Sequence, residues 1–166
     1  MSQNAITFLK HQHDEMKELL ASFAATTDRG IKIRRELLGK IDVELRHHMQ
    51  LEEEIFYPEF KKAVDRKKDK KLYFEAKEEH HVARGVLHDL IHADPGSLAF
   101  GGKVNVLKEL VEHHVHEEES EMFPLAKEVF TAEELKELGA KMETRKRALE
   151  TGHGWDRSTV AAHSHL

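Results

Sequence analysis

Apolar residues recur every three or four positions along most of the chain, which is the spacing of one face of an α-helix. Such stripes run over residues 6–23, 38–55, 73–90 and 104–125. No segment alternates convincingly between apolar and polar positions as a half-buried strand does. The pattern therefore predicts an all-α fold in which amphipathic helices bury their stripes against one another.

Each stripe is interrupted by histidine or glutamate. The polar residues on the predicted seams are His13, His48, Glu52, His80, His114 and Glu118. Residues four apart project from one helix face about 6 Å apart, so each His-x-x-x-Glu pair offers a nitrogen and an oxygen to one small volume. Burial of such groups costs several kcal/mol unless they are satisfied, so the set needs a common partner.

Two segments of the chain repeat each other. HHMQLEEEIFYP at 47–58 aligns without a gap with HHVHEEESEMFP at 113–124, and KHQHDEMKELL at 10–20 parallels KEEHHVARGVL at 77–87. The chain is thus a duplicated helix pair, and each copy contributes one lone histidine and one His-x-x-x-Glu. Antiparallel, up-down-up-down packing in a four-helix bundle would bring these residues to one level, which predicts a site for two metal ions.

The composition restricts the kind of metal site. The sequence has 14 histidines and no cysteine, which excludes disulfides, thiolate zinc sites, iron–sulfur clusters and cysteine nucleophiles. Imidazoles and carboxylates suit a pair of first-row metals better than calcium or magnesium. Iron is the first choice for this site, and manganese or zinc would also fit the ligand types.

Charge and hydropathy exclude other classes of partner. The formal net charge of −5 argues against a nucleic-acid binder that relies on positive charge. No stretch approaches the roughly 20 apolar residues that span a bilayer, so no membrane partner is expected. The N-terminal residues show no secretory signal pattern, and we expect a cytoplasmic protein.

The bundle is expected to occupy residues 1–130, with a further helix at 131–151 packed on or near it. Thr131 followed by Glu134 is the capping-box pattern that begins a helix. The thin apolar face of this helix consists of Leu135, Leu138, Met142 and Leu149. Residues 152–166 are expected to form a flexible tail, whose histidines, His153, His163 and His165, are solvated.

The remaining histidines and glutamates near the seams are expected to play lesser roles. His47 and His113 lie one residue off the seam and are predicted to flank the site. Predicted solvated histidines are His81, His88, His92 and His116. The neighbouring glutamates are expected to be mostly solvated, with one or two bonded to ligating imidazoles: Glu53, Glu54, Glu117, Glu119 and Glu121. Pro58 and Pro124 should either end or kink their helices.

The motifs QHDEMKELL, HHMQLEEEIFYP, EEHHVARGVLHDL and HHVHEEESEMFP resemble those of the hemerythrin-like, or HHE cation-binding, family over residues of about 5 to 130. The resemblance implies an antiparallel four-helix bundle around a non-haem di-iron centre, bridged by carboxylates and an oxo or hydroxo group. It also implies that the two iron ions are bound by the six seam residues, His13, His48, Glu52, His80, His114 and Glu118.

The sequence departs from that of the oxygen-carrying hemerythrins at two positions. Those carriers have a second histidine one turn before the ligand of the third helix, where this chain has Ala76. They also have an aspartate five residues after the histidine of the fourth helix, where this chain offers Glu118 four residues after His114. The missing imidazole leaves a coordination position for water, a glutamate, Tyr73 or a small molecule. This favours reactivity with hydrogen peroxide, oxygen or nitric oxide over reversible oxygen carriage.

Three functions remain open from the sequence. The first is a di-iron redox protein that handles peroxide or oxygen, with catalase-like or peroxidase-like activity as one form. The second is a binding protein, which carries or senses oxygen or nitric oxide or buffers iron. The third is a metal-free structural bundle.

Overall fold

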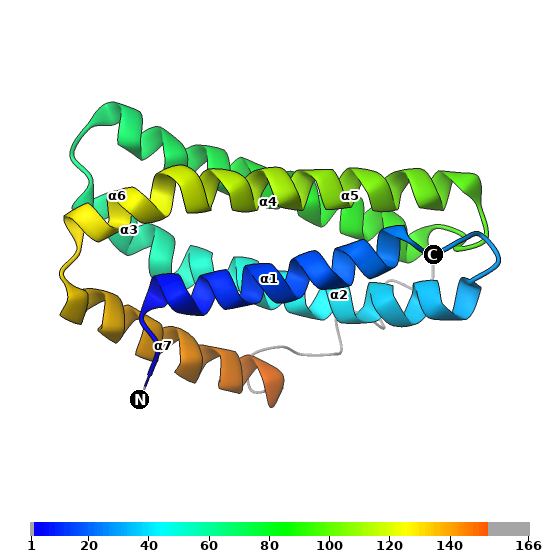
Figure 1. Cartoon of the computed structure of the whole chain (residues 1–166), viewed down its shortest axis with the longest axis horizontal. Helices are drawn as coiled ribbons and strands as arrows, with labels where there is room; N and C mark the ends of the chain where they lie inside the picture. The colour runs from blue at the N-terminus through cyan, green and yellow to red at the C-terminus, as the bar shows by residue number, and fades with distance from the viewer. Residues whose placement is uncertain (1, 153–166) are drawn as a thin grey trace, which may run out of the picture.

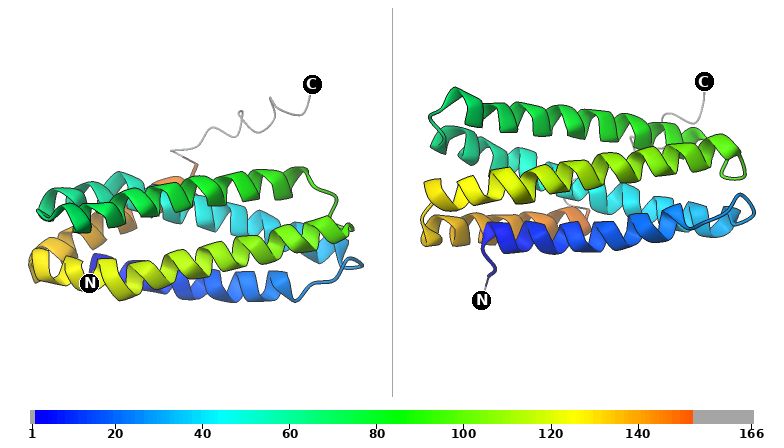
Figure 2. Two further views of the ribbon diagram at one scale, coloured as in Figure 1. Left: turned by 90° about the horizontal axis from the view of Figure 1, so that it is seen from above. Right: turned by 45° about the horizontal axis from the view of Figure 1, so that its top comes forward.

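A computed structural model describes residues 2–152, so the expected tail and its histidines lie outside the described residues. Four long helices lie side by side along the long axis of the molecule (Figure 1). They are α1 (Ala5–Ala24), α2 (Ile31–Leu51), α4 (Lys67–His92) and α5 (Leu98–Glu117). The chain turns back at each connection between them (Figure 2). Residues 2–152 contain no strand, which confirms the all-α prediction.

Two of the long helices widen into a π-helical turn. α2 continues through η1 (Glu52–Phe56) into α3 (Tyr57–Ala63), and α5 continues through η2 (Glu118–Met122) into α6 (Phe123–Val129). In η1 the backbone N–H of Tyr57 donates to the carbonyl of Glu52, five residues earlier. The helices therefore do not end at Pro58 or Pro124, because a wider turn precedes each proline.

Because of the π turns, the predicted buried positions at the ends of two stripes were wrong. Ile55 and Leu125 were expected to continue the buried stripes, but both are only partly buried. The buried positions at the end of the π turns and beyond are instead Phe56, Tyr57 and Phe60 in the first copy, and Phe123 and Ala126 in the second. One extra residue in the turn shifts every later side chain round the helix axis.

The apolar core has two parts. One cluster, which includes Leu9 and Ala76, surrounds α3, α6 and α7. The other, which includes Met16 and Ala83, fills the opposite half of the four long helices. His13 lies between Leu9 and Met16 in α1, so the seam histidines occupy the level where the two clusters meet.

The helix α7 (Ala132–Glu150) packs on α1 and α2. Its predicted capping box is confirmed: Thr131 Oγ1 accepts from the N–H of Glu134, and the Thr131 N–H donates to Glu134 Oε2 at 2.7 Å. The predicted apolar face is also buried. None of the described helices is long and apolar enough to cross a membrane.

Candidate metal centre

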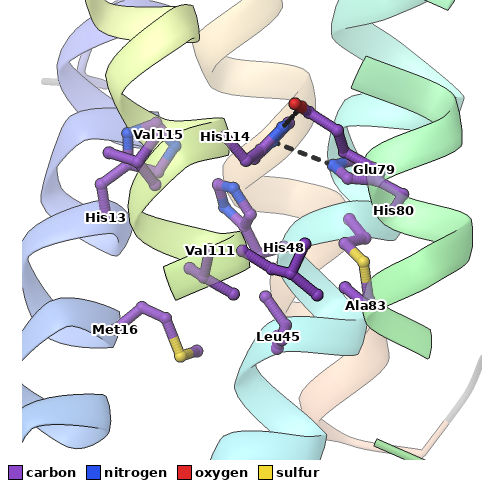
Figure 3. Close-up of a pocket in the computed structure, with 12 residues that line it drawn as sticks. His13, Met16, Leu45, His48, Glu79, His80, Ala83, Val111, His114 and Val115 are labelled. Atoms are coloured by element: carbon purple, nitrogen blue, oxygen red, sulfur yellow. Dashed lines mark hydrogen bonds and ion pairs between the residues drawn. The ribbon is translucent and has the colours of Figure 1, made fainter. Parts of the chain in front are cut away.

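The structure brings the six predicted seam residues together in the middle of the bundle. Each of them is at most 7 % exposed: His13, His48, Glu52, His80, His114 and Glu118. The four imidazoles come from four different helices and point toward one volume (Figure 3). Their donor atoms form two neighbouring groups, each compact enough to hold a metal ion.

The first group consists of His13, His48, Glu52 and Glu118. His13 Nε2 lies 3.1 Å from Glu118 Oε2, and His48 Nε2 lies 3.1 Å from Glu52 Oε1. His13 Nε2 is also 3.9 Å from Glu52 Oε1. Two nitrogens and two oxygens thus surround one point.

The second group consists of Glu52, His80 and His114. His80 Nε2 lies 3.1 Å from Glu52 Oε2 and 3.2 Å from His114 Nε2, and His114 Nε2 lies 3.6 Å from Glu118 Oε1. Both carboxylates therefore present one oxygen to each group.

Several of these atoms have no hydrogen-bond partner although they are fully buried. Of the five such side-chain atoms among residues 2–152, four belong to the first group: His13 Nε2, His48 Nε2, Glu52 Oε1 and Glu118 Oε2. A buried polar atom without a partner costs about 1–3 kcal/mol. Because these atoms face one another, a single cation would satisfy all four, and the residues fit a bound metal.

A second layer of side chains holds each imidazole by its other nitrogen. The Nδ1 atoms lie 2.6–2.9 Å from an oxygen of Glu119 for His13, Gln12 for His48, Glu53 for His80 and Glu79 for His114. A hydrogen bond at Nδ1 fixes the ring and leaves Nε2 free to bind a metal. The predicted hydrogen bonds between neighbouring glutamates and seam imidazoles are thus present for Glu53 and Glu119, whereas those of Gln12 and Glu79 were not predicted.

Tyr57 lies against the second group, and the sequence did not predict this position either. Its hydroxyl oxygen lies 2.6 Å from Glu118 Oε1, 3.1 Å from Glu52 Oε2 and 3.2 Å from His80 Nε2. Burial and the two carboxylates raise the pKa of Tyr57 well above its ordinary value, so without a metal the phenol stays protonated. Tyr73 does not reach this position, because its ring packs edge-on against Tyr57.

Comparison with known proteins identifies the family. The family model described as the hemerythrin HHE cation-binding domain matches residues 4–126. The chain belongs to this family. The HHE domain is also similar, at 28 % identity and a TM-score of 0.78, to the crystal structure of a hemerythrin HHE cation binding domain-containing protein, the Rv2633c homolog from Mycobacterium kansasii; the match covers 90 % of this chain and 89 % of that one. A search of curated proteins gave no significant match.

Family membership and the buried His/Glu cluster together indicate a metal centre in this HHE domain, with iron as the expected metal.

The negative charge of the nearby carboxylates acts on the pKa values of the buried imidazoles. Burial lowers the pKa of His114, but the charge of Glu118 and further hydrogen bonds outweigh burial and raise that pKa to about 10. For His48 burial prevails and its pKa is lowered. Protons and metal ions therefore compete for the same nitrogens.

A small cavity of about 20 Å³ adjoins the four imidazoles of the HHE domain (Figure 3). Its other walls are mostly apolar and include Met16, Leu45, Ala83 and Val111. A space of this size holds one molecule of about the size of water. The cavity thus offers room for a small ligand beside the centre.

The other histidines of the HHE domain lie away from the two groups. The four predicted to be solvated, His81, His88, His92 and His116, are exposed, as predicted. His47 is buried, and the charges that act on it come from Glu44, Lys146 and Glu150. His113 is exposed and contacts Glu79 and Glu117.

Proposed function

We propose that this chain is a non-haem di-iron protein that reacts with, or binds, a small oxidant such as hydrogen peroxide or oxygen. The observation that carries the proposal is the set of buried, unpartnered donor atoms on His13, His48, Glu52 and Glu118. The other oxygen of Glu52 belongs to the second group, and the other oxygen of Glu118 lies 3.6 Å from His114 Nε2. Membership of a cation-binding family supports it independently.

In this proposal Glu52 and Glu118 would each contribute oxygens to both ions. His13 and His48 would hold the first ion, and His80 and His114 would hold the second, with the Tyr57 oxygen beside it. The paired irons would supply one-electron steps to a small oxidant.

The residues of the chain restrict what reaches the centre. Met16, Leu45 and Val111, each at most 5 % exposed, keep bulk water away from the imidazoles. The cavity beside them has room for a molecule of about the size of water and excludes larger substrates. The Nδ1 hydrogen bonds hold the imidazole rings in the orientation that metal binding requires. Together these features favour a diatomic ligand or peroxide.

The test is peroxide turnover by the iron-loaded protein. We expect the wild type to bind about two irons per chain and to release oxygen from hydrogen peroxide, and we expect Glu118→Ala and His80→Ala to lose this activity. His116→Ala, which changes an exposed histidine of the same helix as His114, is the matched control and should keep it. Full turnover by Glu118→Ala and His80→Ala would contradict the proposal for peroxide, and a reversible spectral change with oxygen but no turnover would favour a carrier instead.

A further inference from the structure

The buried position of the proposed centre raises the question of how an ion arrives there. Every one of the six seam residues is at most 7 % exposed. A hydrated divalent ion loses its water at a considerable cost, so it enters a protein most readily where exposed ligands replace the water step by step. Such ligands would have to lie next to the centre and face solvent.

Glu79, His113 and Glu117 meet both conditions. His113 Nε2 lies 3.2 Å from Glu117 Oε1 and 3.5 Å from Glu79 Oε1, and the three donor atoms lie within 4.8 Å of one another. The exposed fractions of these side chains are 62 % for His113, 33 % for Glu117 and 22 % for Glu79. One nitrogen and two oxygens thus meet at the surface.

Glu79 connects this surface group to the buried centre. While one of its oxygens faces His113, the other lies 2.6 Å from His114 Nδ1. Glu79 also lines the small cavity that the four buried imidazoles share, and Figure 3 shows it directed toward His114. The same side chain therefore borders both the exposed group and the interior.

The charges around Glu79 differ from those around the other second-layer glutamates. Glu53 lies 3.0 Å from Arg84 and Glu119 lies 3.9 Å from Lys17. Among residues 2–152, by contrast, no lysine or arginine nitrogen forms an ion pair with Glu79 or Glu117. Two carboxylates beside one exposed imidazole, without a lysine or arginine partner, form a group that a divalent cation would neutralise.

The duplicated copy of the chain has no such group. The positions equivalent to Glu79, His113 and Glu117 are Gln12, His47 and Leu51, and all three are buried. The surface group is therefore not a by-product of the repeat that produces the centre.

We infer that Glu79, His113 and Glu117 form an uptake site for a divalent first-row cation, from which ferrous iron passes along Glu79 to the His114 side of the buried centre. The inference rests on the proposed function, because it assumes that the centre takes up iron.

Binding at the surface group is tested with Zn²⁺ as the probe. We expect titration calorimetry on the iron-loaded wild type to detect one further Zn²⁺ ion per chain, and we expect the variant His113→Ala/Glu117→Gln to lose it. His88→Ala, which changes an exposed histidine outside the surface group, is the matched control and should keep the zinc ion. Unchanged zinc binding in the double variant would overturn the uptake site.

Transfer to the centre is tested by the rate of iron loading. When metal-free protein is mixed anaerobically with ferrous iron, we expect the double variant to reach the same final iron content as the wild type, but about tenfold more slowly. Equal loading rates would overturn the transfer step. A wild type that never binds two irons would instead overturn the proposed function, while zinc binding at the surface group could still be measured.

Discussion

At the scale of single residues, the aromatic rings stacked on the two halves of the centre differ by one hydroxyl group. Phe123 stacks on His13 with ring centroids 5.7 Å apart, and the equivalent Tyr57 stacks on His80 at 5.4 Å. Only the second ring carries an oxygen, and that oxygen faces Glu52 and the second pair of imidazoles. The two proposed ions are therefore inequivalent.

Tyr57→Phe isolates the contribution of this oxygen. The variant keeps the aromatic packing but removes the phenol, so we expect the fold to remain and iron binding to weaken by about tenfold, with loss of any visible absorption from a phenolate bound to ferric iron. Tyr73→Phe, which removes the phenol of the neighbouring ring packed edge-on against Tyr57, is the control. Identical optical spectra for wild type and Tyr57→Phe would show that the phenol does not bind iron.

The cavity makes a prediction for Ala83, a small buried residue in its wall. Ala83→Val fills part of a space of about 20 Å³, so we expect unchanged iron content but peroxide turnover lower by about tenfold, because the oxidant no longer fits beside the centre. Gly85→Ala adds a methyl group to open space on the same helix and should leave turnover unchanged. Equal turnover in both variants would place the reaction outside this cavity.

At the scale of helices, the regular α-helical period predicted the residues of the centre up to the first residue of each π turn and no further. His48 and Glu52 are four residues apart and share a face, as expected for an α-helix. Residues five apart, such as Glu52 and Tyr57, lie about 140° apart round an α-helix, so the period directs Tyr57 away from the centre. The π turn aligns residues five apart, and it brings the Tyr57 hydroxyl to Glu52. The only local sign was the proline that follows Tyr57.

Gln12 and Glu79, which hold imidazoles by Nδ1, could not be predicted from the sequence for a different reason. Gln12 and Glu79 each precede a seam histidine by one residue, but each bonds the histidine of another helix, His48 or His114. Which pairs meet depends on how the helices pack, and a stripe on one helix does not contain this information. Glu53 and Glu119 were easier to anticipate, because each follows a seam glutamate within the repeated motif.

The attachment of α7 depends on one glycine. A Cβ atom on Gly139 would overlap the backbone of Gln3 and Asn4, so only glycine allows the N-terminal segment to lie this close. We expect Gly139→Ala to lower the free energy of unfolding by about 1–3 kcal/mol, measured by urea denaturation. Gly39→Ala, in open space on α2, should instead raise it by about 0.5–1 kcal/mol. Equal effects of the two substitutions would mean that α7 does not pack tightly against this segment.

At the scale of the whole molecule, a polar layer separates two apolar clusters. Its unpartnered atoms oppose folding until a cation satisfies them, so metal should be part of the stability of the protein. Free iron at about 100 times its Kd would add about 2.7 kcal/mol for each ion bound. We therefore expect removal of iron by a chelator to lower the Tm of the wild type but not that of Glu118→Ala, which lacks one of the two carboxylates of the proposed centre. A wild-type Tm that does not respond to chelation would argue against a structural contribution of the metal.

Because the helix pair is duplicated within one chain, the sequences of the two copies can diverge independently. A helix pair with one histidine on its first helix and a His-x-x-x-Glu on its second complements a copy of itself, as the subunits of a twofold dimer do. In a dimer of identical chains every substitution would appear twice and both halves would change together. Because the two copies here belong to one chain, Phe123 and Tyr57, or Gln12 and Glu79, can diverge independently. One half of the centre can then specialise while the other keeps its original ligands.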